Sequence, residues 1–380
     1  MEGPRALRPG ELEPLVALTN LVFRPEGGDM GKEFSYFLHA ENAAHLRVCA
    51  EGERIVAHCG YRPAEMLILG ARVRAACLGA VCTHPDFRGK GLATELLGDA
   101  LGTMKSEGVS LALISGTRGL YTRSGAVLAA GTRDFFFNPS LRSDWEAEVD
   151  VAPARPADAV SLAAIYRREP LRFMRPPAEW ADIIAGRWCM DRAARLFSIR
   201  RGGELVAYAA VRSPVPPKPQ PPEDGTRLGE FAGCRRALAA ALPRLADLGE
   251  CPEIRVPVAA WDRPLAVELA ARGLEAGGLS ATRSVKIVNF PRLMESLRDL
   301  LVERAGPRAG ELAFSETPGG RVAVALHAER LELSDVEACR MVFGGKSGPD
   351  RKMLKGRGEL GKVLGAALPV ETPWYGYDFA

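Results

Sequence analysis

The sequence lacks several features that would mark particular classes of protein. No stretch of about 18 uninterrupted apolar residues occurs, so a membrane-spanning helix is not expected. The net charge is only +3 and no long basic run is present, which argues against nucleic acid as a partner. No apolar segment of the kind that directs secretion follows the first residues. We therefore expect a cytoplasmic protein.

Patterns for binding metal ions are also missing. The chain has eight cysteines and five histidines, but no two cysteines form a C-x-x-C pair and the histidines do not cluster with them. We expect no metal site. Most cysteines lie among apolar neighbours, as reduced cysteines of a protein core do.

The length and the composition indicate a globular protein of more than one domain. The chain has 380 residues, 47% of them hydrophobic and 26% charged. A single hydrophobic core seldom serves a chain of this length, so two or three domains are expected. A composition shift near residues 144–158, acidic and then rich in proline, is a plausible first boundary.

The most informative stretch runs from residue 76 to residue 115. Residues 76–83 are apolar and end at a Pro-Asp turn, which is typical of a buried strand. A loop with two glycines follows, and from Leu92 onward apolar residues recur on one face of a predicted helix. Gly108 would end this helix, and residues 109–114 predict a second buried strand.

This order of strand, glycine loop, helix and strand is typical of phosphate binding. The first turn of a helix presents unpaired N–H groups and a partial positive charge, and glycines let a phosphate approach them. No Walker sequence G-x-x-x-x-G-K-[ST] occurs, and Thr94 stands where a dinucleotide fingerprint needs glycine or alanine. A tight turn with two solvated bases, Arg88 and Lys90, is the simplest alternative.

The remaining residues predict further helices and strands, and one segment repeats the central order of strand, loop, helix and strand. Before residue 76 we expect two helices, the second at residues 32–42, and two hairpins. A strand at residues 227–232, a helix at residues 235–248 and a strand at residues 254–258 repeat the central order, but the loop between them lacks paired glycines. We assign no function to the proline-rich residues 214–225.

The glycine loop resembles the acetyl-CoA loop of GCN5-related N-acetyltransferases (GNAT). That family has the pattern [RQ]-x-x-G-x-[GA], and residues 88–93, R-G-K-G-L-A, satisfy it in register. Over its full length the chain resembles the enhanced intracellular survival (Eis) type of acetyltransferase. The resemblance rests on residues 81–85, on Tyr121, and on an aromatic C-terminus that includes Trp374 and Tyr377.

The resemblance implies a mixed α/β fold with three domains. Residues 1–145 would form a catalytic GNAT domain, residues 146–284 a degenerate GNAT-like domain that binds no coenzyme A, and residues 285–380 a domain similar to sterol carrier proteins. Family members assemble as hexamers, so a homo-oligomer is expected. Their C-terminal tail reaches the active site of the first domain.

The resemblance also implies a role for individual residues. Tyr121 would be the general acid and the Ala380 carboxylate the base, although a tyrosine that merely packs beside the loop is the alternative. Main-chain groups near Val81 would polarise the thioester. The residues expected to contact acetyl-CoA are Val81, Cys82, Thr83, Arg88, Gly89, Lys90, Gly91, Leu92, Ala93, Thr94, Ser115 and Gly116.

The expected activity is therefore transfer of acetyl from acetyl-CoA to an amine. Family precedent suggests a cationic acceptor, such as an aminoglycoside or polyamine, with a protein lysine or a small metabolite amine as alternatives. The segment Ser124-Gly125-Ala126 replaces aromatic residues of the family near the acceptor, which leaves the acceptor open. A different class, a non-catalytic carrier of lipid or acyl-CoA, remains a second interpretation because of the predicted third domain.

Overall fold

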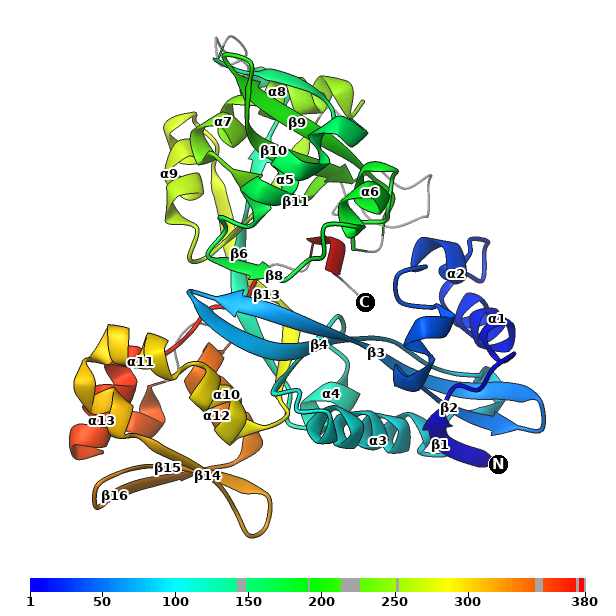
Figure 1. Ribbon diagram of the computed structural model, residues 1–380, viewed down its shortest axis with the longest axis vertical. Coiled ribbons are helices and arrows are strands. Elements are labelled where there is room, and N and C mark those ends of the chain that lie inside the picture. Colours follow the sequence, from blue (N-terminus) through cyan, green and yellow to red (C-terminus); the bar gives the residue numbers. More distant parts are fainter. Residues whose placement is uncertain are drawn as a thin grey trace. The chain divides into compact units, whose positions relative to one another are not determined.

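The computed structural model describes residues 1–141, 148–190, 192–212, 226–250, 253–345, 351–373 and 376–378. Contacts divide the chain into two compact units (Figure 1). The first comprises Met1–Ala129 and Thr282–Val370, and the second comprises Ala130–Ala281 and the tail segment from Glu371. The described residues contain no helix that is long and apolar enough to cross a bilayer.

The first unit is built on a twisted sheet in the order β1-β2-β3-β4-β5-β13. Neighbouring strands run antiparallel except β4 and β5, which are parallel and are joined by the crossover helix α3. The elements are β1 (Glu2–Ala6), α1 (Leu12–Phe23), α2 (Met30–Glu33), β2 (Leu46–Glu51), β3 (Arg54–Ile68), β4 (Ala71–Thr83), α3 (Leu92–Ser106), β5 (Leu111–Ile114), α4 (Gly119–Arg123) and β13 (Ala276–Ile287), the last of which begins in the second unit.

Helix α3 packs on this sheet through its apolar face. Its buried residues include Leu96, Leu97 and Met104, and they share one core with residues of β3, β4 and β5. Gly108, with φ +78°, follows the end of the helix, and the amide of Val109 closes it on the Met104 carbonyl at 2.9 Å. These observations confirm the predicted strand–loop–helix–strand order.

The helix predicted at residues 32–42 is wrong. Helix α2 ends at Glu33, and a short 3₁₀ helix, Ala40–His45, leads into β2. Phe34 and Phe37 are buried in the core, and the side chain of Asn42 donates to the main-chain carbonyl of Phe37 at 2.9 Å. Burial of the aromatic rings and this side-chain bond to the backbone override the local preference for a helix.

The first unit also contains the C-terminal helices and a small sheet, β14-β15-β16. Leu301 of α11 and Leu360 and Leu364 of α13 are fully buried, as are Val324 and Leu326 of β15. The elements are α10 (Phe290–Ser296), α11 (Arg298–Ala305), β14 (Ala313–Thr317), β15 (Arg321–Leu326), β16 (Glu329–Leu333), α12 (Asp335–Phe343) and α13 (Gly358–Ala367).

The second unit has the sheet β6-β12-β11-β10-β9-β7, in which β11 and β12 run parallel. Its elements are β6 (Val127–Phe137), β7 (Asp150–Pro153), α5 (Ala159–Tyr166), β8 (Leu171–Phe173), α6 (Glu179–Ile184), β9 (Ala194–Arg201), β10 (Glu204–Arg212), β11 (Arg227–Gly233), α7 (Arg235–Ala240), α8 (Leu242–Leu248), β12 (Ile254–Ala259) and α9 (Arg263–Ala271).

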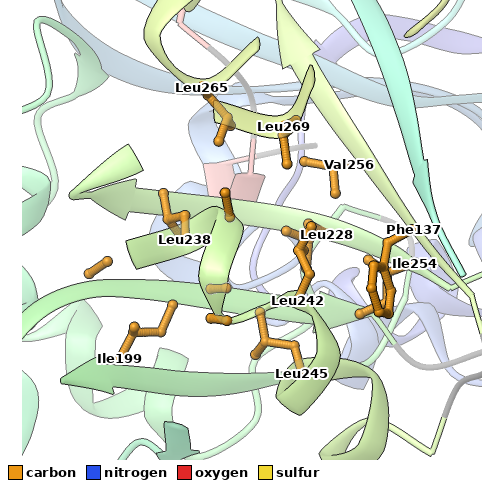
Figure 2. Packing of buried hydrophobic residues seen from close by; sticks show 14 of the residues in the cluster. Phe137, Ile199, Leu228, Leu238, Leu242, Leu245, Ile254, Val256, Leu265 and Leu269 are labelled. Atoms are coloured by element: carbon orange, nitrogen blue, oxygen red, sulfur yellow. The ribbon is translucent and has the colours of Figure 1, made fainter. Parts of the chain in front are cut away.

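Its core lies between the sheet and helices α7 to α9. Figure 2 shows Leu238, Leu242 and Leu245 of the helices together with Leu228 and Ile254 of the sheet, all fully or nearly fully buried. The single helix predicted at residues 235–248 is divided into α7 and α8. Pro243 lies at the break, and because proline has no N–H it cannot continue the helical hydrogen-bond ladder.

Two predictions concern residues that the structure does not describe. The proline-rich loop at residues 214–225 lies outside the described residues, and so do residues 144–147 of the first predicted domain boundary. The division into three domains at residues 145 and 284 stays a prediction.

Candidate acetyl-CoA site

The site is organised by strand β4, which is longer than its parallel neighbour. Pairing between β4 and β5 ends at Leu78 and Ile114, whereas β4 continues to Thr83. In the described sheet, β5 offers no ladder partner to the last five residues of β4. Main-chain groups of these residues on that side are therefore not used by a β5 ladder, which leaves room for a ligand between the separating strands.

A β-bulge interrupts β4 at the same level. His58 pairs with Cys82 and Gly60 with Gly79, so Ala80 and Val81 both lie opposite the single residue Cys59. Ala80 has φ +51°, a left-handed conformation that alanine rarely adopts. The bulge re-aims the main chain just before Val81 and Cys82, which line the pocket described below.

The glycine loop then leads into helix α3. Gly89 and Gly91 have φ of +78° and +84°, and a side chain is disfavoured at such angles. Gly91 is the N-cap, and no side chain caps the helix. The first amides of α3 at Leu92 and Ala93 thus remain available to an anion, with the positive end of the helix dipole behind them.

A pocket of about 550 Å³ opens at this helix start. Four of its lining residues are cationic and none of the described lining residues is acidic, as a site for phosphates requires. Ten of the twelve predicted cofactor residues line it, and Ser115 and Gly116 do not. The lining residues are Val22, Val81, Cys82, Thr83, Phe87, Arg88, Gly89, Lys90, Gly91, Leu92, Ala93, Thr94, Arg118, Leu120, Tyr121 and Arg123.

The two loop bases are held differently. The ammonium of Lys90 lies 4.4 Å from the centre of the Phe87 ring, which is a cation–π distance. The guanidinium of Arg88 reaches back to the Thr83 carbonyl at 3.4 Å. Both residues line the pocket, so its wall carries their positive charges.

Tyr121 lines the same pocket from helix α4 and is almost fully buried. Burial raises the pKa of its phenol to about 12, so the hydroxyl is protonated at neutral pH. A β-carbon added at Gly116 would lie 2.6 Å from Cε2 of Tyr121, which places the ring directly against that glycine. The hydroxyl of Ser284 in turn donates to the Gly116 carbonyl at 2.8 Å.

Gly116 therefore supports the tyrosine instead of lining the pocket, and Ser284 fixes Gly116. Sequence reasoning missed Ser284. A single serine carries no local pattern that would distinguish it from the other serines of the chain.

Cys82 lines the pocket as a thiol, not as a thiolate. Burial raises its pKa to about 12, although Arg118 and Arg88 oppose the shift. Only the thiolate is a competent nucleophile. Cys59, on the neighbouring strand, is fully buried and its pKa is raised by the same cause.

The corresponding loop of the second unit is occupied by its own side chains. The amide of Gly233, at the end of β11, donates to the carboxylate of Glu169 at 2.8 Å. Arg235 forms ion pairs with Glu169 at 2.7 Å and with Asp262 at 2.9 Å. The cavity beside them measures only about 50 Å³.

The described part of the C-terminal tail docks on the second unit through a buried ionic cluster. Arg175, whose side chain is fully buried, pairs with Glu230 at 2.9 Å and with Asp378 at 2.6 Å. Tyr208 donates to Glu230 at 2.8 Å, and the guanidinium stacks on the Tyr166 ring at 4.3 Å. Sequence analysis missed this cluster because its members are far apart in the chain.

Comparisons with known proteins support an acetyltransferase. Residues 4–129 match the family of acetyltransferase (GNAT) domains. No curated protein matches the chain.

Solved structures with the same fold cover nearly the whole chain. A GCN5-related N-acetyltransferase from Anabaena variabilis has a TM-score of 0.69 at 14% identity, covering 97% of this chain and 98% of that one. One from Kribbella flavida has a TM-score of 0.60 at 15% identity, covering 96% and 94%. Eis1 from Mycobacterium abscessus has a TM-score of 0.59 at 16% identity, covering 97% and 98%.

The predicted fold class is thereby confirmed. The chain has the GNAT fold with mixed α/β content, residues 4–129 carry its acetyltransferase domain, and the protein is an acetyl-CoA-dependent transferase.

Proposed function

We propose that the protein transfers acetyl directly from acetyl-CoA to a primary amine. One observation carries the proposal: the pocket at the start of α3 combines helix amides that no side chain caps, four cationic side chains and a protonated tyrosine. Phosphates suit the first two features, and a departing thiolate suits the third.

Acetyl-CoA would bind along the separating strands. The amides of residues 89–94 and the bases Arg88 and Lys90 would hold the pyrophosphate. The pantetheine arm would pair with the main chain of residues 81–83, which β5 leaves open. Ser115 and Gly116, which follow β5, do not line the pocket, so no contact with the cofactor is proposed for them.

Tyr121 is proposed as the general acid. The amine nitrogen attacks the thioester carbonyl, a C–N bond forms, the C–S bond breaks, and the thiolate takes the phenolic proton. The raised pKa keeps that proton on Tyr121 until sulfur leaves. The protonated Cys82 argues against a covalent acetyl-cysteine intermediate, because the thiol is a poor nucleophile.

The attacking amine also has to lose protons. None of the described lining residues carries a carboxylate or an imidazole, so the base comes from elsewhere. We assign this role to the carboxylate of Ala380, which lies outside the described residues. The assignment rests on the family resemblance alone.

The remaining predictions belong to this proposal. Residues 1–145 are the catalytic GNAT domain, and residues 146–284 are a degenerate one in which Glu169 and Arg235 occupy the anion loop. Residues 285–380 form a domain similar to sterol carrier proteins. The protein is cytoplasmic, assembles as a homo-oligomer, of six chains by family resemblance, and takes an aminoglycoside, a polyamine or another cationic amine.

Steady-state release of free thiol from acetyl-CoA, measured across a panel of amines, tests the proposal. We expect turnover with at least one polyamine or aminoglycoside, and its loss in Tyr121→Phe while calorimetric binding of acetyl-CoA persists. Deletion of residues 376–380 should abolish turnover as well. Wild-type turnover in Tyr121→Phe would assign the acid to another group, and absence of heat with acetyl-CoA would refute the site.

A further inference from the structure

The β4 bulge is held by a side chain for which the proposed mechanism has no use. His58 of β3 is fully buried, and its Nδ1 lies 2.8 Å from the carbonyl oxygen of Ala80. A carbonyl only accepts hydrogen bonds, so Nδ1 carries the proton. The ring therefore donates to the residue with the left-handed backbone.

The ring is neutral and has no second bond. Burial lowers the pKa of His58 to about 4, so the imidazole is uncharged at neutral pH. Nε2 is buried without a hydrogen-bond partner in the described structure. An unpaired buried nitrogen is unfavourable, and a leucine of similar size would avoid it. The bond to Ala80 is what the histidine provides.

Gly60 leaves space for this ring because it has no side chain. A β-carbon added at Gly60 would lie 2.8 Å from Nε2 of His58 and 2.8 Å from Cζ of Phe37. Both rings thus pack against Gly60, and a side chain there would displace His58 from its contact with Ala80.

The bulge itself is unfavourable without such support. Alanine at φ +51° is strained, and a β-strand without the extra residue would pair His58, Cys59 and Gly60 in regular register. The next residue after Ala80 is Val81, which lines the pocket in which the thioester is proposed to lie. A shift of Ala80 would carry the Val81 amide with it.

We infer that His58 is a positioning residue for the acetyl-transfer reaction: by donating to the Ala80 carbonyl it holds the β4 bulge so that the Val81 amide points at the thioester oxygen. The inference rests on the proposed function. An amide in this place stabilises the oxyanion that forms when the amine attacks, and this stabilisation acts only if the amide is fixed beforehand.

The sharpest test compares two amide side chains at this position. The shorter one, in His58→Asn, would place its NH₂ close to where Nδ1 stands and so keep the donor. The longer one, in His58→Gln, would carry the NH₂ further, towards the place of Nε2, and so lose the bond to Ala80. We expect His58→Asn to retain kcat within about threefold and His58→Gln to lose about tenfold or more, with KM for acetyl-CoA changed by less than about threefold in both.

His58→Leu and a distant core variant complete the set. His58→Leu should lose kcat as His58→Gln does. Leu301→Ala, in α11, should lower the melting temperature while leaving kcat per folded molecule unchanged. This control separates a loss of kcat from a loss of stability. If His58 only stabilised the fold, its variants would lower the melting temperature and leave kcat per folded molecule unchanged, as Leu301→Ala should.

The outcomes distinguish the inference from the function on which it rests. If the wild type releases thiol and His58→Gln keeps its kcat, His58 does not position the bulge, although the proposed function stands. Equal loss in His58→Asn and His58→Gln would overturn the inference too. If the wild type turns over no amine, the proposed function fails and the inference fails with it.

Discussion

The contact between Gly116 and Tyr121 gives the most direct test of the proposed acid. In Gly116→Ala the new methyl carbon would lie 2.6 Å from Cε2 of Tyr121, whereas ordinary contacts begin at 3.4 Å. Because the hydroxyl of Ser284 fixes the Gly116 carbonyl, the backbone cannot easily retreat. The tyrosine ring has to move instead, by about 0.8 Å if it takes up the whole overlap.

A displacement of this size is large for proton transfer. Misplacing a reacting group by about 1 Å can cost on the order of 100-fold in rate. We therefore expect Gly116→Ala to lower kcat by roughly 30- to 100-fold, with binding of acetyl-CoA nearly unchanged, because Gly116 does not line the pocket. Steady-state assays of thiol release measure kcat, and calorimetric titration measures acetyl-CoA binding separately.

A double variant shows whether the effect passes through Tyr121. If it does, Gly116→Ala combined with Tyr121→Phe should be no slower than Tyr121→Phe alone. The matched control is Gly102→Ala in α3, where nothing lies within 4 Å of the added carbon. It should keep full activity and gain about 0.5–1 kcal/mol in stability. Multiplicative losses in the double variant would show that Gly116 and Tyr121 act independently, and the reasoning would be refuted.

Three further predictions concern the charged and titrating groups. Arg88→Ala and Lys90→Ala should each weaken acetyl-CoA binding about three- to tenfold in calorimetric titration, and the effect should be smaller at high salt. An unchanged Kd would show that these two side chains do not bind the phosphates. Because burial raises the pKa of Tyr121 to about 12, the phenol stays protonated as pH rises. Deprotonation of Tyr121 should therefore not lower kcat below about pH 10. A fall in kcat near pH 8 that is absent from Tyr121→Phe would contradict this. Arg175→Met leaves two buried carboxylates uncompensated and should cost about 3–5 kcal/mol in urea unfolding, whereas a loss below about 1 kcal/mol would show that water reaches the cluster.

The strand–loop–helix–strand order of the first unit could be predicted because its signals are local. The turn after β4, the two glycines and the apolar face of α3 lie within about thirty consecutive residues, and each has a direct structural meaning. The predicted helix at residues 32–42 failed for the opposite reason. Its fate depends on Phe37, which is buried against Gly60 of β3 further along the chain, and no local pattern reveals this contact.

The supporting residues of the site could not be predicted. A bulge at Ala80 leaves no trace in the hydrophobic pattern, since an apolar run reads the same with or without one extra residue. His58 and Ser284 act through main-chain carbonyls of other elements, at sequence separations of 22 and 168 residues. Their residue types are ordinary for strands, so only the pairing register shows what they contact.

The two halves of the chain show how one anion loop can be kept open and the other closed. In both units a strand leads through a glycine into a helix and then into a parallel neighbour strand. In the second unit Glu169 already accepts from the Gly233 amide and pairs with Arg235, so a phosphate would have to displace a bonded carboxylate.

No carboxylate lines the first pocket among the described residues, and its bases Arg88 and Lys90 bind only a carbonyl and an aromatic ring. A phosphate group entering there gains charge-assisted hydrogen bonds without breaking an ion pair. The two units thus differ in whether an internal carboxylate reaches the helix start, not in the order of strand, loop, helix and strand that both share.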